Sequence, residues 1–145
     1  MKTSNGCAIG RTWFAAVSVA AAASVGCGAG EPGAEVWGQV ICKGQPLTQG
    51  IVVLTPTSGK ANTEGAGALD DHGRFVIQSS RADVDLIPGR YSISIRPPSY
   101  VTSWRETDET PPGYPVPVKF LDPGHPVLFV DLKAEPMRLD LTLRK

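Results

Sequence analysis

Apolar and polar residues alternate along several short segments of this chain, and a period of two is the pattern of half-buried β-strands. The segment 36–42 shows it first, because Val36, Val40 and Cys42 share one face while Trp37 lies on the other. We take the face with the valines and the cysteine as the side that turns towards the core. A strand is therefore predicted over residues 36–42.

A second strand is predicted over residues 51–55, a β-branched and aliphatic run that Pro56 ends. The residues between the two strands include Gly44 and Pro46, which favour a turn because glycine accepts positive φ and proline cannot donate to a ladder. We expect the two strands to pair as a hairpin joined by this turn.

The outward face of that hairpin is not cleanly polar, since it carries Trp37, Ile41, Ile51 and Val53. Two interpretations fit this composition. The later loop can cover part of the face, which is the ordinary fate of such residues, or the face is a binding patch. The pattern favours cover by the loop and leaves the binding patch open.

The same alternation predicts further strands over residues 74–78, 91–96, 127–133 and 137–143. The last two are expected to form a closing hairpin around residues 134–136. Short strands between turns rich in glycine and proline favour an all-β sandwich or barrel over a helical fold.

The strand that begins at Tyr91 has the cleanest alternation in the chain. Tyr91, Ile93 and Ile95 are expected to face the core. Ser92 and Ser94 are expected to face solvent. Residues 99–126 then form a long connection with six prolines, and so long an excursion within a compact domain is usually functional or disordered.

Several short motifs follow one another in a fixed order. They are the valine strand 36–40 with Gly44-Gln-Pro-Leu, the turn and strand of 70–75, Pro88-Gly-Arg-Tyr, and the segment 116–123. Together they resemble the carboxypeptidase-regulatory-like domains, small transthyretin-like β-sandwiches that are common as short lipoproteins in planctomycete bacteria. The resemblance covers nearly all of residues 35–145 and implies a seven-strand Greek-key sandwich. Leu69 and Phe120 depart from it, standing where the family has threonine and tyrosine.

The start of the chain has the pattern of a secretory signal, with Lys2 and Arg11 before an uncharged stretch rich in alanine and valine and then small residues. The apolar stretch is short for a transmembrane span. Residues 24–27 resemble the lipobox of bacterial lipoproteins, in which a lipid is attached to the cysteine, here Cys27. Ser24 departs from the usual leucine.

These features predict a lipoprotein signal peptide over residues 1–26, a flexible tether over 27–34 and one domain over 35–145. The protein is then exported and anchored to a membrane of the cell envelope through Cys27. The alternative is ordinary secretion with cleavage near Ala23. In that case a disulfide between Cys27 and Cys42 becomes possible, whereas Cys42 in the anchored protein is a lone buried thiol.

The charge balance argues against nucleic acid as a partner. The whole chain is formally neutral, and the predicted signal peptide carries two basic residues and no acidic ones. The remaining chain is therefore slightly acidic and would not be drawn to phosphate backbones.

Residues for catalysis are sparse. The two histidines, His72 and His125, have no partner at metal-ligand spacing, and no nucleophile elbow or phosphate-binding loop is present. The family's fold also includes hydroxyisourate hydrolases, but their terminal Tyr-Arg-Gly-Ser motif is missing here. We expect no catalytic residues, no cofactor and no enzyme activity.

Calcium is one candidate ligand. Asp70, Asp71 and His72 could bind it together with Glu64 through closely spaced ligands. A solvated turn is the favoured interpretation because the spacing fits no known loop motif, so no metal site is assigned.

The long connection offers an aromatic alternative. Tyr100, Trp104 and Tyr114 could form a platform on which sugars stack, although anchoring of the loop onto the sandwich is favoured. The leading hypothesis is a non-catalytic envelope lipoprotein whose β-sandwich contacts a protein or a surface such as polysaccharide. The runner-up is a glycan- or calcium-binding module that uses the 99–126 loop.

Overall fold

The computed structural model of the chain describes residues 33–58, 63–105 and 109–144. Within these ranges the fold is all-β, with nine strands and a single 3-10 turn. The strands are β1 (Val36–Cys42), β2 (Gln45–Pro46), β3 (Ile51–Ser58), β4 (Gly65–Ala68), β5 (Arg74–Ser79), β6 (Gly89–Arg96), β7 (Leu128–Leu132), β8 (Met137–Arg138) and β9 (Leu141–Leu143), and the turn is η1 (Val118–Phe120).

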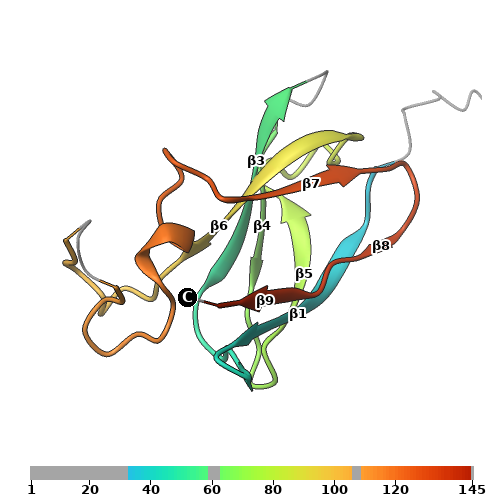
Figure 1. The fold of residues 1–145 in the computed structure, drawn as a ribbon. Coiled ribbons are helices and arrows are strands. Elements are labelled where there is room, and N and C mark those ends of the chain that lie inside the picture. Colours follow the sequence, from blue (N-terminus) through green and yellow to red (C-terminus); the bar gives the residue numbers. More distant parts are fainter. Residues whose placement is uncertain (1–32, 59–62, 106–108, 145) are drawn as a thin grey trace, which may run out of the picture.

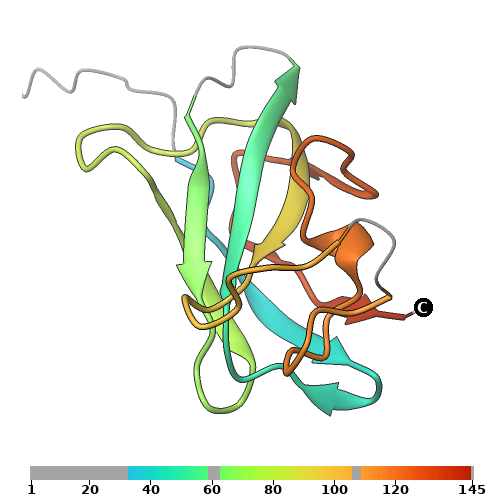
Figure 2. The same ribbon diagram turned by 90° about the vertical axis from the view of Figure 1, so that its left-hand side faces the viewer.

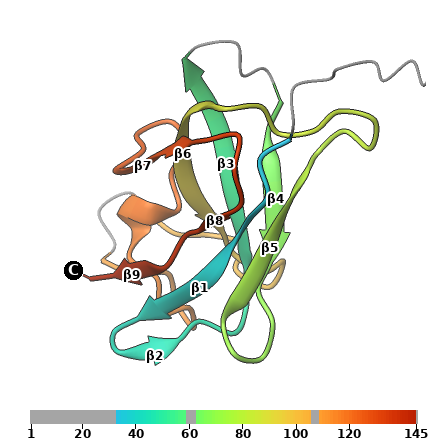
Figure 3. The same cartoon turned by 90° about the vertical axis from the view of Figure 1, so that its right-hand side faces the viewer.

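The strands form one sheet that curls into a half-barrel (Figure 1). Its order is β2-β1-β5-β4-β3-β6-β7, and β8 and β9 lie along the other side of β1. The neighbours in this path are antiparallel, whereas β8 and β9 run parallel to β1. Figure 3 shows β1 between β5 on one side and β8 and β9 on the other. β1 therefore pairs with four other strands and is central to the fold.

The predicted hairpin of residues 36–42 and 51–55 is wrong in its pairing, although both strands exist. β1 turns back at once through Lys43 and Gly44, whose φ angles of 53° and 83° suit a two-residue hairpin turn, and pairs with the short β2. β3 pairs instead with β4 and β6. The two-residue turn commits the returning chain to β2, so β3 starts only after a further loop.

The predicted closing hairpin of residues 127–133 and 137–143 is also wrong. β7 pairs with β6, whereas β8 and β9 pair with β1 at the far end of the sheet. Residues 133–136 cross between the two ends, which the curvature of the sheet brings close together (Figure 1). The last strand is also interrupted, because Leu139 lies against Gly38 of β1 between β8 and β9.

The core faces that the alternation predicted are confirmed. The inward side chains of β1, β3, β5, β6 and β9 all lie in one hydrophobic cluster, which includes Val36, Val40, Cys42, Val52, Leu54, Phe75, Ile77, Tyr91, Ile93, Ile95, Leu141 and Leu143. This cluster fills the inside of the half-barrel.

Two side chains on the outer face of β6 depart from the expectation. Ser92 and Ser94 were expected to face solvent but are buried. Ser92 lies between Thr55 of β3 and Phe129 of β7, and Ser94 lies opposite Val53. Because serine is short, its larger cross-strand neighbours overhang it.

The proline-rich connection covers one side of the half-barrel. Figures 1 and 2 show it beside β6 and the end of β9, with η1 in its second half. Its side chains Val101, Val116, Phe120 and Leu121 belong to the same hydrophobic cluster as the strands. The connection is therefore part of the core rather than an appendage.

The predicted signal peptide, Cys27 and most of the tether lie outside the described residues. In the part of the chain that the structure does describe, none of the helical segments has the length and apolar character needed to cross a bilayer.

Candidate functional site

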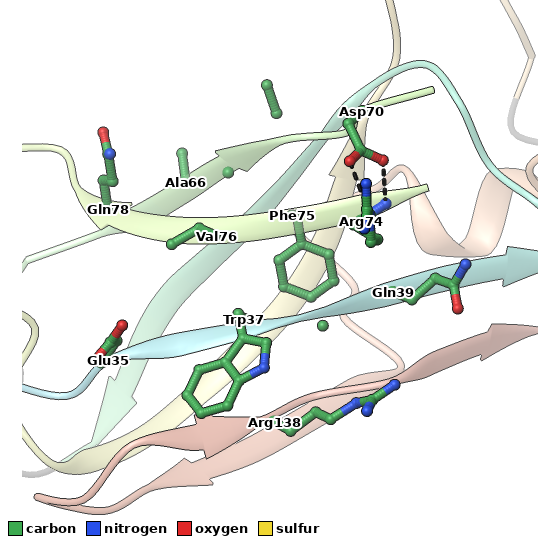
Figure 4. A pocket seen from close by; sticks show the side chains of 13 residues that line it. Glu35, Trp37, Gln39, Ala66, Asp70, Arg74, Phe75, Val76, Gln78 and Arg138 are labelled. Carbon is green, nitrogen blue, oxygen red and sulfur yellow. Dashed lines mark hydrogen bonds and ion pairs between the residues drawn. The ribbon is translucent and has the colours of Figure 1, made fainter. Parts of the chain in front are cut away.

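The register of the sheet assembles a row of outward side chains across β8, β1 and β5. Trp37 of β1 lies opposite Arg138 of β8 on one side and opposite Val76 of β5 on the other. Directly opposed side chains of an antiparallel pair are about 4.5–5.5 Å apart at Cβ, so Val76 is in direct reach of Trp37, and Arg138 lies beside Trp37 on the neighbouring parallel strand. Figure 4 shows the Trp37 indole extending over the outer surface towards Arg138.

A second row lies beside the first. Val36 pairs with Ile77, and the outward residues one step beyond this pair are Glu35 and Gln78. Gln78 in turn lies opposite Ala66 of β4. The row thus runs from a carboxylate through an amide to a methyl group.

These rows border a groove of about 770 Å³ on the outer face (Figure 4). On the β4 side, the floor of the groove is formed by the small residues Ala66, Gly67 and Ala68, so few side-chain atoms fill it. β4 and β5 also approach closely there, since a Cβ on Gly67 would lie 2.5 Å from the carbonyl oxygen of Val76. The hollow therefore follows from a run of small residues beside larger ones.

The apolar part of the groove is exposed. Trp37 is 37% exposed and Val76 is 56% exposed, although both sit in the middle of paired strands. Trp37 and Val76 lie opposite each other, so together they form a small exposed apolar patch that a ligand can reach. Of the outer-face residues named in the sequence, Trp37 is exposed, whereas Val53 is buried.

The charged groups at the rim are held in place by neighbours. Arg74 Nε donates to Asp70 Oδ2 at 3.0 Å, and Arg138 Nε lies 2.9 Å from Asp140 Oδ2. Gln39 Nε2 donates to the carbonyl oxygen of His72 at 2.7 Å. The positive charge at the rim is therefore locally balanced.

Asp70 organises the turn between β4 and β5. Its Oδ1 accepts the backbone N–H groups of His72 and Arg74, each at 2.8 Å. The pKa of Asp70 is lowered, chiefly by the hydrogen bond from the Arg74 backbone and then by that from His72 and by the Arg74 side chain. Both carboxylate oxygens are already used within the turn, which leaves little for a cation.

Other polar groups of the groove are unengaged. The Glu35 carboxylate, the Gln78 amide and the Trp37 indole N–H have no hydrogen-bond partner among the described residues, and all three border the same hollow. They offer acceptors and donors to a bound molecule without first breaking an internal contact.

The aromatic residues predicted in the long connection do not form one platform. Tyr114 is 3% exposed, and its hydroxyl donates to the carbonyl oxygen of Gln49 at 2.8 Å. Burial raises the pKa of Tyr114 above its ordinary value of 10.0, with smaller contributions from Tyr100 and Cys42. The Tyr100 hydroxyl bonds the Gln49 side chain. The two tyrosines thus anchor the connection to Gln49, and Trp104 remains 36% exposed.

The candidate residues His125 and Cys42 do not line the groove. His125 Nδ1 lies 2.8 Å from Asp122 Oδ2, and this hydrogen bond is the main cause of the lowered pKa of Asp122. Cys42 is buried and its Sγ lies 3.4 Å from the carbonyl oxygen of Pro115, and burial raises its pKa. Across the described ranges, no group of three or more potential ligands is placed to hold a metal ion. Cys27 lies outside them.

Comparison of the chain with protein families, with curated proteins and with solved structures found no match. The groove must therefore be interpreted from its own geometry. It combines one exposed aromatic plane, one aliphatic side chain and planar polar groups of both signs on paired strands. Such a site can bind and orient a ligand.

Of the residues that line this groove, the sequence singled out Trp37 as part of a possible binding patch and Asp70 as a possible cation ligand, but not Glu35, Val76, Gln78 or Arg138. Alternation placed Val76 and Gln78 on the outer face of their strand. It could not show that this strand pairs with residues 36–39, because register between distant segments is not written in either segment alone.

Proposed function

We propose that the protein is a non-catalytic binding module of the cell envelope, tethered through a lipid on Cys27, which takes its ligand in the outer-face groove. One observation carries the binding part of this proposal. Trp37 and Val76 remain exposed on paired strands beside the unengaged Glu35 and Gln78 side chains. Exposed apolar surface rimmed by free polar groups is typical of recognition sites.

The tether supports a position close to the membrane. Nine peptide steps separate Cys27 from Val36, the first residue of β1. An extended chain spans about 3.3–3.6 Å per residue, so the domain would start within roughly 30 Å of the lipid. A ligand of this module is therefore sought among the molecules of the envelope.

We also propose that the half-barrel is a variant of the transthyretin-like Greek-key sandwich. The pairings that support this fall into two groups, β5-β1-β9 and β4-β3-β6-β7. Only two residue pairs, Gly65 with Ser79 and Ala66 with Gln78, join β4 to β5 between the groups. A sandwich has two such sheets with inward faces packed on one core.

The intact mass of the protein extracted from membranes of its native host tests the anchor. A species that begins at Cys27 and carries added diacylglycerol mass is expected, and Cys27→Ala should abolish that species. A lipid-free form in the medium or periplasm would contradict the anchor and reopen the disulfide between Cys27 and Cys42.

Contact with a protein strand is a second candidate function, favoured by β7. This strand ends the sheet path and, among the described strands, pairs with β6 alone, and Val127 and Phe129 are about half exposed. Free edges accept partner strands. Phe129→Asp should then remove the protein from any envelope complex on native gels, while Val76→Asp in the groove should not.

A further inference from the structure

We infer that the ligand of the groove is a carbohydrate, a short chain of pyranoses with equatorial hydroxyl groups, with one ring stacked on Trp37. This inference rests on the proposed function in using the same groove, but it does not depend on the lipid anchor. It moves the sugar site from the 99–126 connection to the face of β1, β4, β5 and β8.

The Trp37 indole offers an aromatic plane on which a sugar ring can stack. The Trp37 indole is partly exposed and held on a strand that is paired on both sides, so it is a rigid surface. An aromatic face is electron-rich and attracts the partly positive hydrogen atoms of C–H bonds. A pyranose with equatorial hydroxyl groups presents such C–H bonds on its two flat faces. Val76 extends the apolar contact to one side of the ring.

The rim of the groove carries polar side chains that can bind sugar hydroxyl groups. Glu35 and Gln78 line the same groove as Trp37, and Arg138 lies opposite Trp37 on β8. Their ends are a carboxylate, an amide and a guanidinium, planar groups that can meet two neighbouring oxygens at once. Adjacent hydroxyl groups of a sugar present that pair of oxygens. The rim therefore matches the polar edge of the ring whose face lies on Trp37.

Other classes of ligand fit the groove less well than a sugar does. β1 is hydrogen-bonded on both sides next to Trp37, so a peptide cannot add as a strand there. Phosphate-rich ligands are disfavoured, since Arg74 and Arg138 are balanced by Asp70 and Asp140 and Glu35 adds negative charge. The apolar patch is also small for a protein hot spot.

The size of the groove sets the length of the ligand. Its volume of about 770 Å³ lies in the upper part of the range for small-molecule sites, roughly 300–1,000 Å³. That is room for a short oligosaccharide rather than a single ring. Because the groove is open, we expect weak binding to one module, with a Kd on the order of 1 mM.

The test uses the mature protein extracted from its host in detergent and two probes, cellotetraose and chitotetraose. We expect saturable binding of at least one of these β-linked probes, measured by ligand-observed NMR. Trp37→Ala should weaken binding about tenfold or more, the value of a lost aromatic contact.

Trp104→Ala is the matched control, because Trp104 is as exposed as Trp37 but lies in the connection. Its affinity should stay within about twofold of the unmodified protein. Ala66→Gln and Glu35→Ala change residues that line the groove and should also weaken binding. These two variants replace Trp37→Ala in the test if Trp37→Ala does not fold.

Loss of binding in Trp104→Ala with retention in Trp37→Ala would overturn the inference, and so would failure of both β-linked probes to bind. Neither result bears on the lipid anchor, which the mass measurement tests separately. A membrane-anchored protein that ignores these sugars refutes the ligand class only. A released protein that binds them at Trp37 refutes the anchor only.

Discussion

Gly38 fixes the point where the end of the chain lies against β1. The Leu139 N–H donates to the Trp37 carbonyl oxygen at 2.7 Å, and the Leu139 carbonyl group then turns onto Gly38. A Cβ at residue 38 would lie 1.8 Å from that carbonyl oxygen. Glycine is needed here for space, and the contact holds the strand that carries Trp37.

Gly38→Ala should therefore lower the free energy of unfolding by at least about 3 kcal/mol, because backbone must move to admit the methyl group. Gly44→Ala is the control. Nothing lies within 4 Å of its Cβ position, so only its left-handed φ of 83° opposes alanine, at about 1–2 kcal/mol. Urea unfolding measures both variants. Equal losses would contradict the close approach of Leu139 to β1.

Asp70 should make stability depend on acidity. Its pKa is lowered in the folded chain, so its contribution is complete above the ordinary value of 3.8 and is lost as the pH falls through the lower, folded value. Asp70→Asn should thus lower the urea midpoint at neutral pH, and the gap to the unmodified protein should narrow as the pH falls below 3.8.

Asp71→Asn removes a charge from the same turn without touching the hydrogen bonds that Asp70 accepts. It should change the midpoint much less than Asp70→Asn at neutral pH. A pH-independent gap for Asp70→Asn would show that its carboxylate does not stabilise the turn in the way described.

At the scale of elements, the alternation located most strands and their faces but not their partners. Residues 36–42 and 51–55 are strands with the expected core sides, yet one pairs with β5 and the other with β6. Face is a local property, set by the pleat. Partner and register depend on turns and on packing far along the chain. The groove, which is made by register, was hidden for the same reason.

The long connection is the element whose role the sequence left most open. It was expected to be functional, disordered or anchored on the sandwich. The structure packs it on the core, with Tyr114 and Val116 buried and Cys42 in contact with Pro115. The signal was present in its apolar residues, but they have no regular period to set them apart.

Tyr114→Phe tests that anchoring. It keeps the buried ring and deletes the hydroxyl that donates to the Gln49 carbonyl oxygen, which is then left without this donor. We expect a loss of about 1 kcal/mol in the free energy of unfolding. Tyr100→Phe, whose exposed hydroxyl bonds only the Gln49 side chain, should cost less than about 0.5 kcal/mol. A reversed order would contradict the anchoring role of Tyr114.

At the scale of the whole molecule, curvature decides which faces are available. The curled sheet and the connection enclose one hydrophobic cluster, and the outer surface of β1, β4, β5 and β8 stays open (Figures 3 and 4). The groove is thus built on paired strands, which hold side chains more precisely than loops do. The location in the envelope remains a prediction from the leader pattern, whereas the site emerges only from the assembled sheet.

The central claim is that the groove at Trp37, rather than the connection at Trp104, is the binding surface. It is tested most directly by following the indole N–H signals of the ¹⁵N-labelled protein by NMR while a polysaccharide fraction from the host's own envelope is added. We expect the Trp37 signal to shift progressively and the Trp104 signal to stay in place. A shift of the Trp104 signal alone, or of neither signal, would contradict the account.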